Sequence, residues 1–318
     1  MRPGVQDAGR PPGTHTGVIG FGVEMIEEQR IKPNFFIVGA AKCATTSVYR
    51  YLREHPQVFM SPVKEPKFFS SPYRPIPPAG PGDMRVEDCA VKDMDGYLEL
   101  FRDAGEYPIR GEASVDYLYY HRTADDIRAF NPQARILICL RNPIDRAYSG
   151  YTDHHRSRET LSFHEALHAE EDRATYEFIW QYKKLGLYYE SVKHYLDVFG
   201  ADRVMIVFFA DIKTKLNDTI RDICRFLGVD DTYEIRDVRR FNPSGTPNAF
   251  MRRMGKLLPW VKNAMKWIMP RRYARFRAKT LVKAPMAETD REYLREYYRE
   301  DVAKLSALLG KDLSHWLG

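Results

Sequence analysis

Residues 34–47 read NFFIVGAAKCATTS, an apolar run that leads into a turn of small residues and then into three hydroxyl side chains. The run at 34–38 predicts a β-strand, and the apolar residues after the turn have helical spacing until Pro56. At such a junction the first amides of the helix lack backbone partners and carry partial positive charge. We therefore predict that this stretch binds a phosphate group.

The side chains of this loop suit an anion. Small residues at Gly39, Ala40 and Ala41 let the backbone approach a ligand closely, and Lys42 adds a positive charge. The residues predicted to contact the phosphorylated ligand are Lys42, Cys43, Ala44, Thr45, Thr46 and Ser47. The alternative is an ordinary strand-to-helix turn that a threonine caps.

The loop differs from that of nucleoside triphosphatases. Their loop has a second glycine directly before the lysine, whereas only Gly39 precedes Lys42 here. Those enzymes also use an acidic residue to help hold Mg²⁺. In this chain the predicted strand at 135–140 ends instead at Arg141, which favours a second bound anion and no metal.

Strand and helix patterns alternate along the chain, and several strands are apolar throughout, which is typical of a parallel sheet covered on both faces. Further strands are predicted at 109–113, 135–140 and 204–209, and helices at 124–130, 143–158, 162–171, 187–199, 219–227 and 290–309. The predicted fold class is α/β, a P-loop-like parallel sheet flanked by helices. We expect a flexible leader at 1–30 and one domain at 31–318, with a nucleotide-binding core at 31–247 and a helical part without a clear strand at 248–318.

The composition favours a globular protein over a disordered or membrane-spanning one. Of 318 residues, 44% are hydrophobic and 29% charged, and no apolar run approaches the roughly 20 residues of a membrane span. The first twenty residues lack the hydrophobic core of a signal peptide. The four cysteines form no CxxC pair, so we expect a reduced, cytoplasmic protein with Cys139 and Cys224 buried.

A second motif, LRNPIDRAYS at 140–149, places Arg141 at the end of a strand and Ser149 about two turns into the following helix. Ligands of parallel sheets bind at the carboxyl ends of the strands, so this motif and the first loop can face one crevice. Arg141 and Ser149 would then share a second phosphate, as a nucleotide phosphorylated at both 5′ and 3′ positions requires. Alternatively, Arg141 is a surface ion-pair partner and Ser149 has no ligand.

Together the two motifs resemble the family of sulfotransferases that depend on 3′-phosphoadenosine-5′-phosphosulfate (PAPS), especially its heparan sulfate branch and bacterial relatives. The resemblance covers 33–247 and implies that the first loop holds the 5′ end of PAPS, while Arg141 and Ser149 hold its 3′-phosphate. The stretch RFNPSG at 240–245 resembles the family's loop over the nucleotide. It adds Asn242, Ser244 and Gly245 to the predicted donor site.

Sulfuryl transfer needs a base at the acceptor and positive charge at the leaving phosphate. The stretch KEPKFF at 64–69 resembles the family's K-E-x-x-F-F segment, which implies Glu65 as catalytic base, with Lys42 at the leaving group and Phe68 and Phe69 as walls. The rival bases are His154 and His155, and a glutamate between lysines is often only a solvated charge.

The sequence differs from the heparan sulfate branch of this family at one position that bears on the acceptor. The heparan-type enzymes carry a lysine where this chain has Ala113, which weakens the case for a glycosaminoglycan.

The basic stretch at 252–283 contains eleven Lys or Arg and no acid, interleaved with apolar residues that include two tryptophans. Such a pattern fits a helical lid, peripheral contact with a membrane, or a surface for an anionic or lipid-linked acceptor. No nucleic-acid-binding motif accompanies it, so we expect no nucleic-acid partner.

These features predict a PAPS-dependent sulfotransferase that acts without a metal on a hydroxyl or amine of a carbohydrate, lipid-linked or small-molecule acceptor. The transfer would be an in-line displacement, and the residues do not identify the acceptor or the oligomeric state. The alternatives are a P-loop kinase of small molecules and a non-catalytic protein that binds nucleotides or polyanions.

Overall fold

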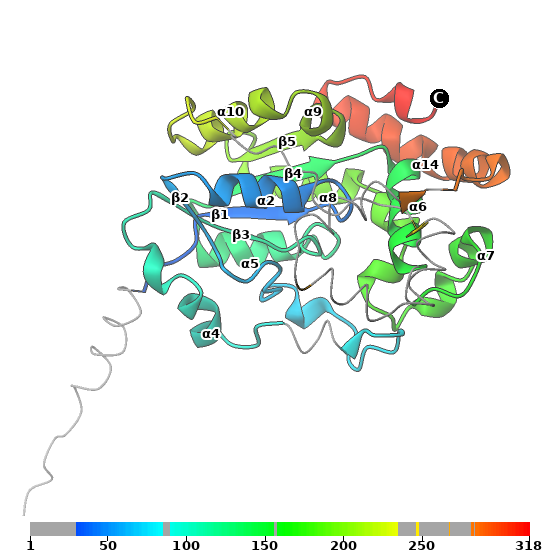
Figure 1. Ribbon diagram of the computed structural model, residues 1–318, viewed down its shortest axis with the longest axis horizontal. Helices are drawn as coiled ribbons and strands as arrows, with labels where there is room; N and C mark the ends of the chain where they lie inside the picture. Colours follow the sequence, from blue (N-terminus) through cyan, green and yellow to red (C-terminus); the bar gives the residue numbers. More distant parts are fainter. Residues whose placement is uncertain are drawn as a thin grey trace, which may run out of the picture.

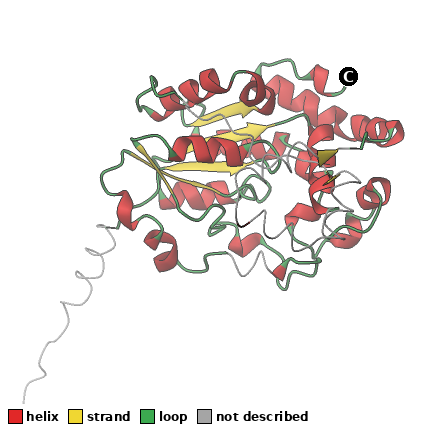
Figure 2. Cartoon of the chain, viewed as in Figure 1, coloured by secondary structure: helices red, strands yellow, loops and turns green. Residues whose placement is uncertain are grey.

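The computed structural model describes residues 30–84, 90–155, 158–234, 246–247, 267, 281–282 and 284–318. A five-stranded sheet lies at the centre of the molecule, with helices around it (Figures 1 and 2). Its strands are β1 (Phe35–Gly39), β2 (Val58–Met60), β3 (Ile109–Ala113), β4 (Arg135–Leu140) and β5 (Val204–Phe208). The order is β2-β3-β1-β4-β5 and every neighbouring pair is parallel, which confirms the predicted fold class.

Helices connect the strands and cover the sheet. They are α2 (Thr45–Arg53), α4 (Met94–Glu99), α5 (Thr123–Phe130), α6 (Pro143–His154), α7 (Phe163–His168), α8 (Tyr189–Phe199), α9 (Phe209–Thr214), α10 (Leu216–Leu227) and α14 (Glu288–Leu309). Short 3-10 turns lie at Ser71–Tyr73, Arg102–Ala104, Glu171–Arg173, Phe178–Trp180, Lys184–Gly186 and Ser314–Trp316. Helix α2 contacts α10, α5 contacts α8, and α14 packs on α6 and α8.

The central strands are buried on both faces, as their continuous apolar sequences predict. The β1 side chains Phe35, Phe36, Ile37 and Val38 have no exposed surface, and the β4 residues after Arg135 are equally buried. Cys139 and Cys224 are buried, as expected for small residues inside apolar segments. The first loop is therefore attached to a strand whose residues are all buried.

Local signals for helix ends are confirmed at several positions. Ser162 and Glu165 form a capping box at the start of α7, and Gly228 ends α10 in a left-handed conformation. Asn142 caps α6 by accepting hydrogen bonds from the amides of Ile144 and Asp145.

Other boundaries differ from the prediction. Helix α6 ends at His154 and not near 158, α7 ends at His168 and not at 171, and Phe209 begins α9 and does not extend β5. Strand β2 was not predicted, because three residues are too short to show alternation. The C-terminal part also contains a short strand, contrary to expectation, since β7 (Leu281–Val282) pairs antiparallel with β6 (Thr246–Pro247) at the end of the core range.

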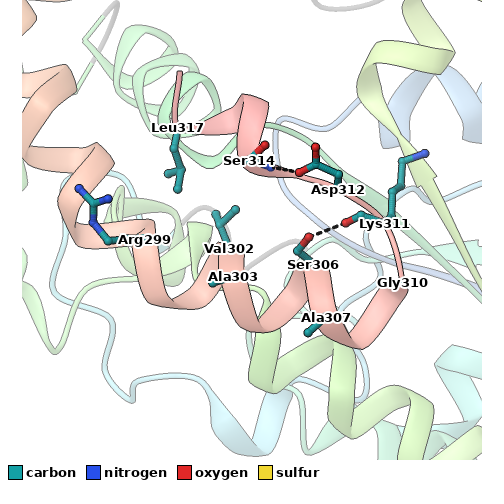
Figure 3. A pocket seen from close by; sticks show the side chains of 10 residues that line it. All are labelled: Arg299, Val302, Ala303, Ser306, Ala307, Gly310, Lys311, Asp312, Ser314 and Leu317. Atoms are coloured by element: carbon teal, nitrogen blue, oxygen red, sulfur yellow. Dashed lines mark hydrogen bonds between the residues drawn. The ribbon is translucent and has the colours of Figure 1, made fainter.

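The last long helix, α14, forms a hollow of about 600 Å³ with the C-terminal segment. Val302, Ala303, Ser306 and Leu317 line it, with other residues of 299–317 (Figure 3). None of the lining residues belongs to a motif predicted to bind the donor. Within the described ranges, no helix is long and apolar enough to cross a membrane.

Residues 1–29 of the predicted leader at 1–30, and most of the basic stretch at 252–283, lie outside the described residues. The interpretations of both segments, and the division of the domain at 247, therefore stay predictions.

Candidate active site

The order of the strands brings three segments of the chain to one edge of the sheet. Strand β1 lies between β3 and β4, and the carboxyl ends of these parallel strands meet at that edge. The first loop follows β1 and Arg141 follows β4. The third segment joins at β3, where the amide of Glu65 donates a 2.9 Å hydrogen bond to the carbonyl of Ala113.

The first loop has the backbone of an anion site. Lys42 and Ala44 adopt left-handed φ angles of 69° and 68°, and α2 begins at Thr45 directly afterwards. Among the described residues, no side chain caps α2, and the amide of Ser47 already donates a 2.9 Å hydrogen bond to the carbonyl of Ala44. The first amides of a helix otherwise lack intrahelical partners and can bind a ligand. The hydroxyls of this turn belong to Thr45, Thr46 and Ser47, and the last two residues are half-buried. This local geometry favours an anion.

Cys43 can serve this loop only through its backbone. Its side chain is buried, and burial raises the pKa of the thiol to about 11. The hydroxyl of Tyr188 lies 3.9 Å from the Cys43 sulfur and donates a 3.0 Å hydrogen bond to the carbonyl of Arg141. Tyr188 thus connects the loop after β1 to the residue after β4.

Arg141 reaches the first loop directly. One guanidinium nitrogen donates a 3.3 Å hydrogen bond to the carbonyl of Lys42, and the guanidinium lies 4.4 Å from the Phe209 ring centre. Within the described part of the chain, the Nε of Arg141 is buried without a hydrogen-bond partner, and such a group costs about 1–3 kcal/mol. Ser149 is buried on α6, two turns along the same motif. The unpaired donor fits a phosphate beside Arg141.

Lys42 has a partner that the sequence analysis missed. Its ammonium lies 3.0 Å from a carboxylate oxygen of Asp153 on α6. Asp153 follows Ser149 by four residues, so both face the same side of the helix. That spacing was the signal by which Asp153 could have been found.

Glu65 lies among cations. The ammonium of Lys64 is 2.5 Å from one of its carboxylate oxygens, and that of Lys67 is 3.8 Å from the other. Burial raises the pKa of Glu65, but the positive charges of Lys64, Lys67 and Lys42 outweigh it and hold this pKa below its ordinary value. The carboxyl is therefore ionised at neutral pH, and with 31% of the side chain exposed a ligand can reach it.

Backbone strain marks the same two segments. Within the described residues, the non-glycine residues with positive φ are Lys42, Ala44, Glu65 and Lys67, the last two at 64° and 56°. Such conformations cost free energy and are maintained where the surrounding structure requires them, commonly at functional sites.

Lys67 and Asp116 are two further charged residues near Glu65. The Lys67 side chain is 8% exposed, and its ammonium lies 5.1 Å from the centre of the Phe178 ring. Asp116 is fully buried and accepts a 2.7 Å hydrogen bond from Ser70, while its other oxygen has no hydrogen-bond partner. Burial raises the pKa of Asp116, and the charge of Lys67 opposes that effect. Neither residue was singled out from the sequence.

The two phenylalanines after Glu65 do not both line the site. Phe69 is buried in the core, with its ring centre 6.0 Å from that of Phe36, which corrects the prediction that it walls the site. Phe69 points to the sheet, since its nearest strand partner, Phe36, belongs to β1. Phe68 is half-buried and stacks on Tyr97 with ring centres 4.6 Å apart.

The two histidines of α6 have tyrosine partners. The Nδ1 of His154 lies 3.2 Å from the Tyr182 hydroxyl, and burial lowers the pKa of His154 to about 4. His155 is exposed, and its Nδ1 lies 3.1 Å from the Tyr151 hydroxyl. His154 is therefore neutral at physiological pH and follows Asp153 directly in the chain.

The third predicted donor-binding motif, at 240–245, is not covered by the described residues. Asn242, Ser244 and Gly245 are outside the described residues. Among the residues that are described, no group of three His, Cys, Asp or Glu side chains could hold a metal ion.

The protein has a parallel sheet, a loop with the geometry of an anion site after its central strand, and an arginine after the adjacent strand. This arrangement defines the class of P-loop-like nucleotide-binding proteins. A family model described as a sulfotransferase domain matches residues 32–306, and the chain belongs to that family, whose sulfuryl donor is PAPS. This confirms the resemblance, and no comparison supports the kinase alternative.

Individual proteins that are similar to this chain are also sulfotransferases by name. A crystal structure of a sulfotransferase from Alicyclobacillus acidocaldarius is similar, with 38% identity and a TM-score of 0.73, over 90% of this chain and 99% of that one. Carbohydrate sulfotransferase 15 of Mus musculus is 27% identical over 63% of this chain and 44% of its own length. Bifunctional heparan sulfate N-deacetylase/N-sulfotransferase 1 of Homo sapiens is 25% identical over 90% of this chain and 31% of its own length. The chain thus spans less than half the length of these two curated relatives.

Proposed function

We propose that the protein transfers a sulfuryl group from PAPS to a hydroxyl or amine of an acceptor by in-line displacement. The observation that carries this proposal is the meeting of three segments at one sheet edge: the loop of Lys42, Arg141 after β4, and Glu65 on the carbonyl of Ala113. Family membership supports the same reaction.

The donor would lie along the edge with its 5′ end at the first loop. Lys42 and the first turn of α2, from Thr45 to Ser47, supply the ammonium, amides and hydroxyls for that end. Arg141 and Ser149 would hold the 3′-phosphate, a role that the unpaired Nε of Arg141 supports. Asn242, Ser244 and Gly245 are assigned to the donor by resemblance alone.

PAPS supplies the activated sulfuryl group. The ionised Glu65 carboxylate accepts a proton from the acceptor hydroxyl or amine, a contribution typically worth 10²- to 10⁴-fold in rate. The Lys42 ammonium stabilises the negative charge that develops on the leaving phosphate oxygens. His154 and His155 are the alternative bases, and burial lowers the pKa of His154 to about 4, so that it is neutral at physiological pH.

For the acceptor, the names of two relatives favour a carbohydrate, while lipid-linked and small molecules stay alternatives. The replacement of the heparan-type lysine by Ala113, a buried residue at the end of β3, favours an acceptor other than a heparan chain.

Calorimetric titration tests the donor site. The desulfated product 3′,5′-adenosine bisphosphate should bind with about micromolar affinity, and Arg141→Ala should weaken it by about 100-fold or more, because charged hydrogen bonds to a phosphate are lost. Arg203→Ala is the matched control, since Arg203 precedes β5 at the opposite edge of the sheet and contacts Gln133. Tight binding of ATP with Mg²⁺, together with weak binding of the bisphosphate, would replace this proposal by the kinase alternative.

A second test concerns the base. Glu65→Gln should reduce transfer of labelled sulfuryl from PAPS to desulfated glycans and phenols by about 100-fold or more, while binding of the bisphosphate is kept. Transfer at the wild-type rate by this variant would exclude Glu65 as the base and favour His154 or His155.

A further inference from the structure

Asp153 is an acidic residue in a site that otherwise collects positive charge. Its carboxylate accepts a 3.0 Å hydrogen bond from the Lys42 ammonium, across 111 positions of sequence. Both side chains reach solvent, with 44% of Asp153 and 25% of Lys42 exposed. Asp153 therefore forms an ion pair with the same ammonium group that, in the proposed function, binds the 5′ end of the donor.

The surroundings explain why a counter-charge is needed there. The positive end of α2 begins three residues after Lys42, and the guanidinium of Arg141 is bonded to the carbonyl of Lys42. On the other side, the charge of Lys42 also influences Glu65, which already has Lys64 and Lys67 as neighbours. Among the residues that the structure describes, Asp153 is the one that holds the Lys42 ammonium by a direct hydrogen bond.

An anionic donor competes with this pair. A phosphate oxygen at the first loop would lie close to the Lys42 ammonium and therefore close to the Asp153 carboxylate, and two negative charges at such a distance repel each other. The half-exposed position of Asp153 in the last turn of α6 gives its side chain room to rotate into solvent. The ammonium can thus exchange one anionic partner for another.

We propose that Asp153 is a positioning residue that binds the Lys42 ammonium in the donor-free protein, yields it to the 5′-phosphate end of the nucleotide, and recovers it as the product leaves. This inference rests on the proposed function. Asp153 lowers the affinity for the nucleotide and speeds release of the desulfated product, because the returning carboxylate replaces the departing phosphate.

The test is a comparison of two nucleotides on two proteins. Asp153→Asn should bind 3′,5′-adenosine bisphosphate about tenfold more tightly than the wild type and release it more slowly in stopped-flow experiments. Adenosine 3′-monophosphate, which lacks the 5′-phosphate, should bind both proteins equally. The matched control is Asp197→Asn, which removes an acid from the exposed Lys193–Asp197 pair on α8 and should leave both affinities unchanged.

Equal or weaker binding of the bisphosphate by Asp153→Asn would overturn the inference while leaving the proposed function intact. Absence of bisphosphate binding by the wild type would instead defeat the proposed function itself. A crystal structure of the wild-type protein with the bisphosphate gives a measurement that does not depend on the variant. Separation of Lys42 and Asp153 beyond hydrogen-bond distance is expected, and a pair kept at about 3 Å would contradict the exchange.

Discussion

At the scale of single residues, Glu65 is a carboxylate surrounded by lysines, and its environment serves two purposes. The cations keep it ionised, as a proton acceptor must be, but they also lower its pKa and so weaken it as a base. Lys67 is the buried member of this group and is placed by a left-handed backbone and by the Phe178 ring. We therefore expect Lys67 to set the pH range in which Glu65 works.

Replacement of Lys67 by methionine should raise the pKa of Glu65, because one of its two nearest positive charges is lost. Since the base acts when ionised, the acid limb of the pH profile of kcat/KM should move to higher pH, so that activity falls more at about pH 5 than at about pH 8. Lys67→Arg should restore the wild-type profile. An acid limb at the same pH in Lys67→Met would show that Lys67 has a structural role only.

At the scale of elements, the junction of β1 with the first loop depends on the absence of a side chain at Gly39. This residue has a φ of 155°, and an added Cβ would lie 2.6 Å from the Cβ of Leu118 and 3.1 Å from the carbonyl oxygen of Val115. Neither of these atoms is the flexible end of a side chain. The close approach of 115–118 to β1 therefore requires glycine.

Replacement of Gly39 by alanine should lower the free energy of unfolding by about 1–3 kcal/mol, because the overlap can be relieved only by a backbone shift. Urea unfolding measures this change. Gly105→Ala is the control, since Gly105 has a φ of −55° and its added Cβ would meet only the end of the Ile31 side chain at 3.3 Å. Equal losses in the two variants would contradict the explanation.

At the scale of the whole molecule, the fold buries the carboxyl groups of Glu112 and Glu170. Glu112 on β3 accepts hydrogen bonds from Tyr97 and Ser114, at 3.0 Å and 2.9 Å, and burial raises its pKa to about 7. Burial likewise raises the pKa of Glu170 to about 7. Because these two carboxyl groups are buried, the free energy of unfolding of the protein depends on pH.

Between its ordinary pKa of 4.5 and about 7, Glu112 binds more protons in the folded than in the unfolded protein, so its contribution to stability falls as pH rises through that window. Glu112→Gln should therefore gain stability relative to the wild type by up to about 3 kcal/mol between about pH 5 and 7. The difference between the two proteins is the test, because neutral, buried His154 acts in the opposite direction below its ordinary pKa.

Urea unfolding at several pH values provides this difference, and Glu106→Gln, at an exposed position, should follow the wild-type curve in parallel. A constant difference between Glu112→Gln and the wild type across this range would contradict the prediction.

The sequence by itself determined the features that depend on neighbouring residues. The strand at 35–39, its loop and α2 follow from an apolar run, small residues and helical spacing. The start of α7 follows from Ser162, and the end of α10 follows from Gly228. Arg141 falls after a strand for the same reason. Such signals are local, since hydrogen bonds and dihedral preferences act within a few positions.

Only the tertiary structure decided which distant side chains meet. Lys42 pairs with Asp153, Lys67 lies beside Glu65 and Phe178, and Phe69 turns into the core. The short β2 also exists because β3 lies beside it. These outcomes depend on strand order and on packing between segments that are separate in the sequence, because burial and charge are set by whatever the fold brings into contact.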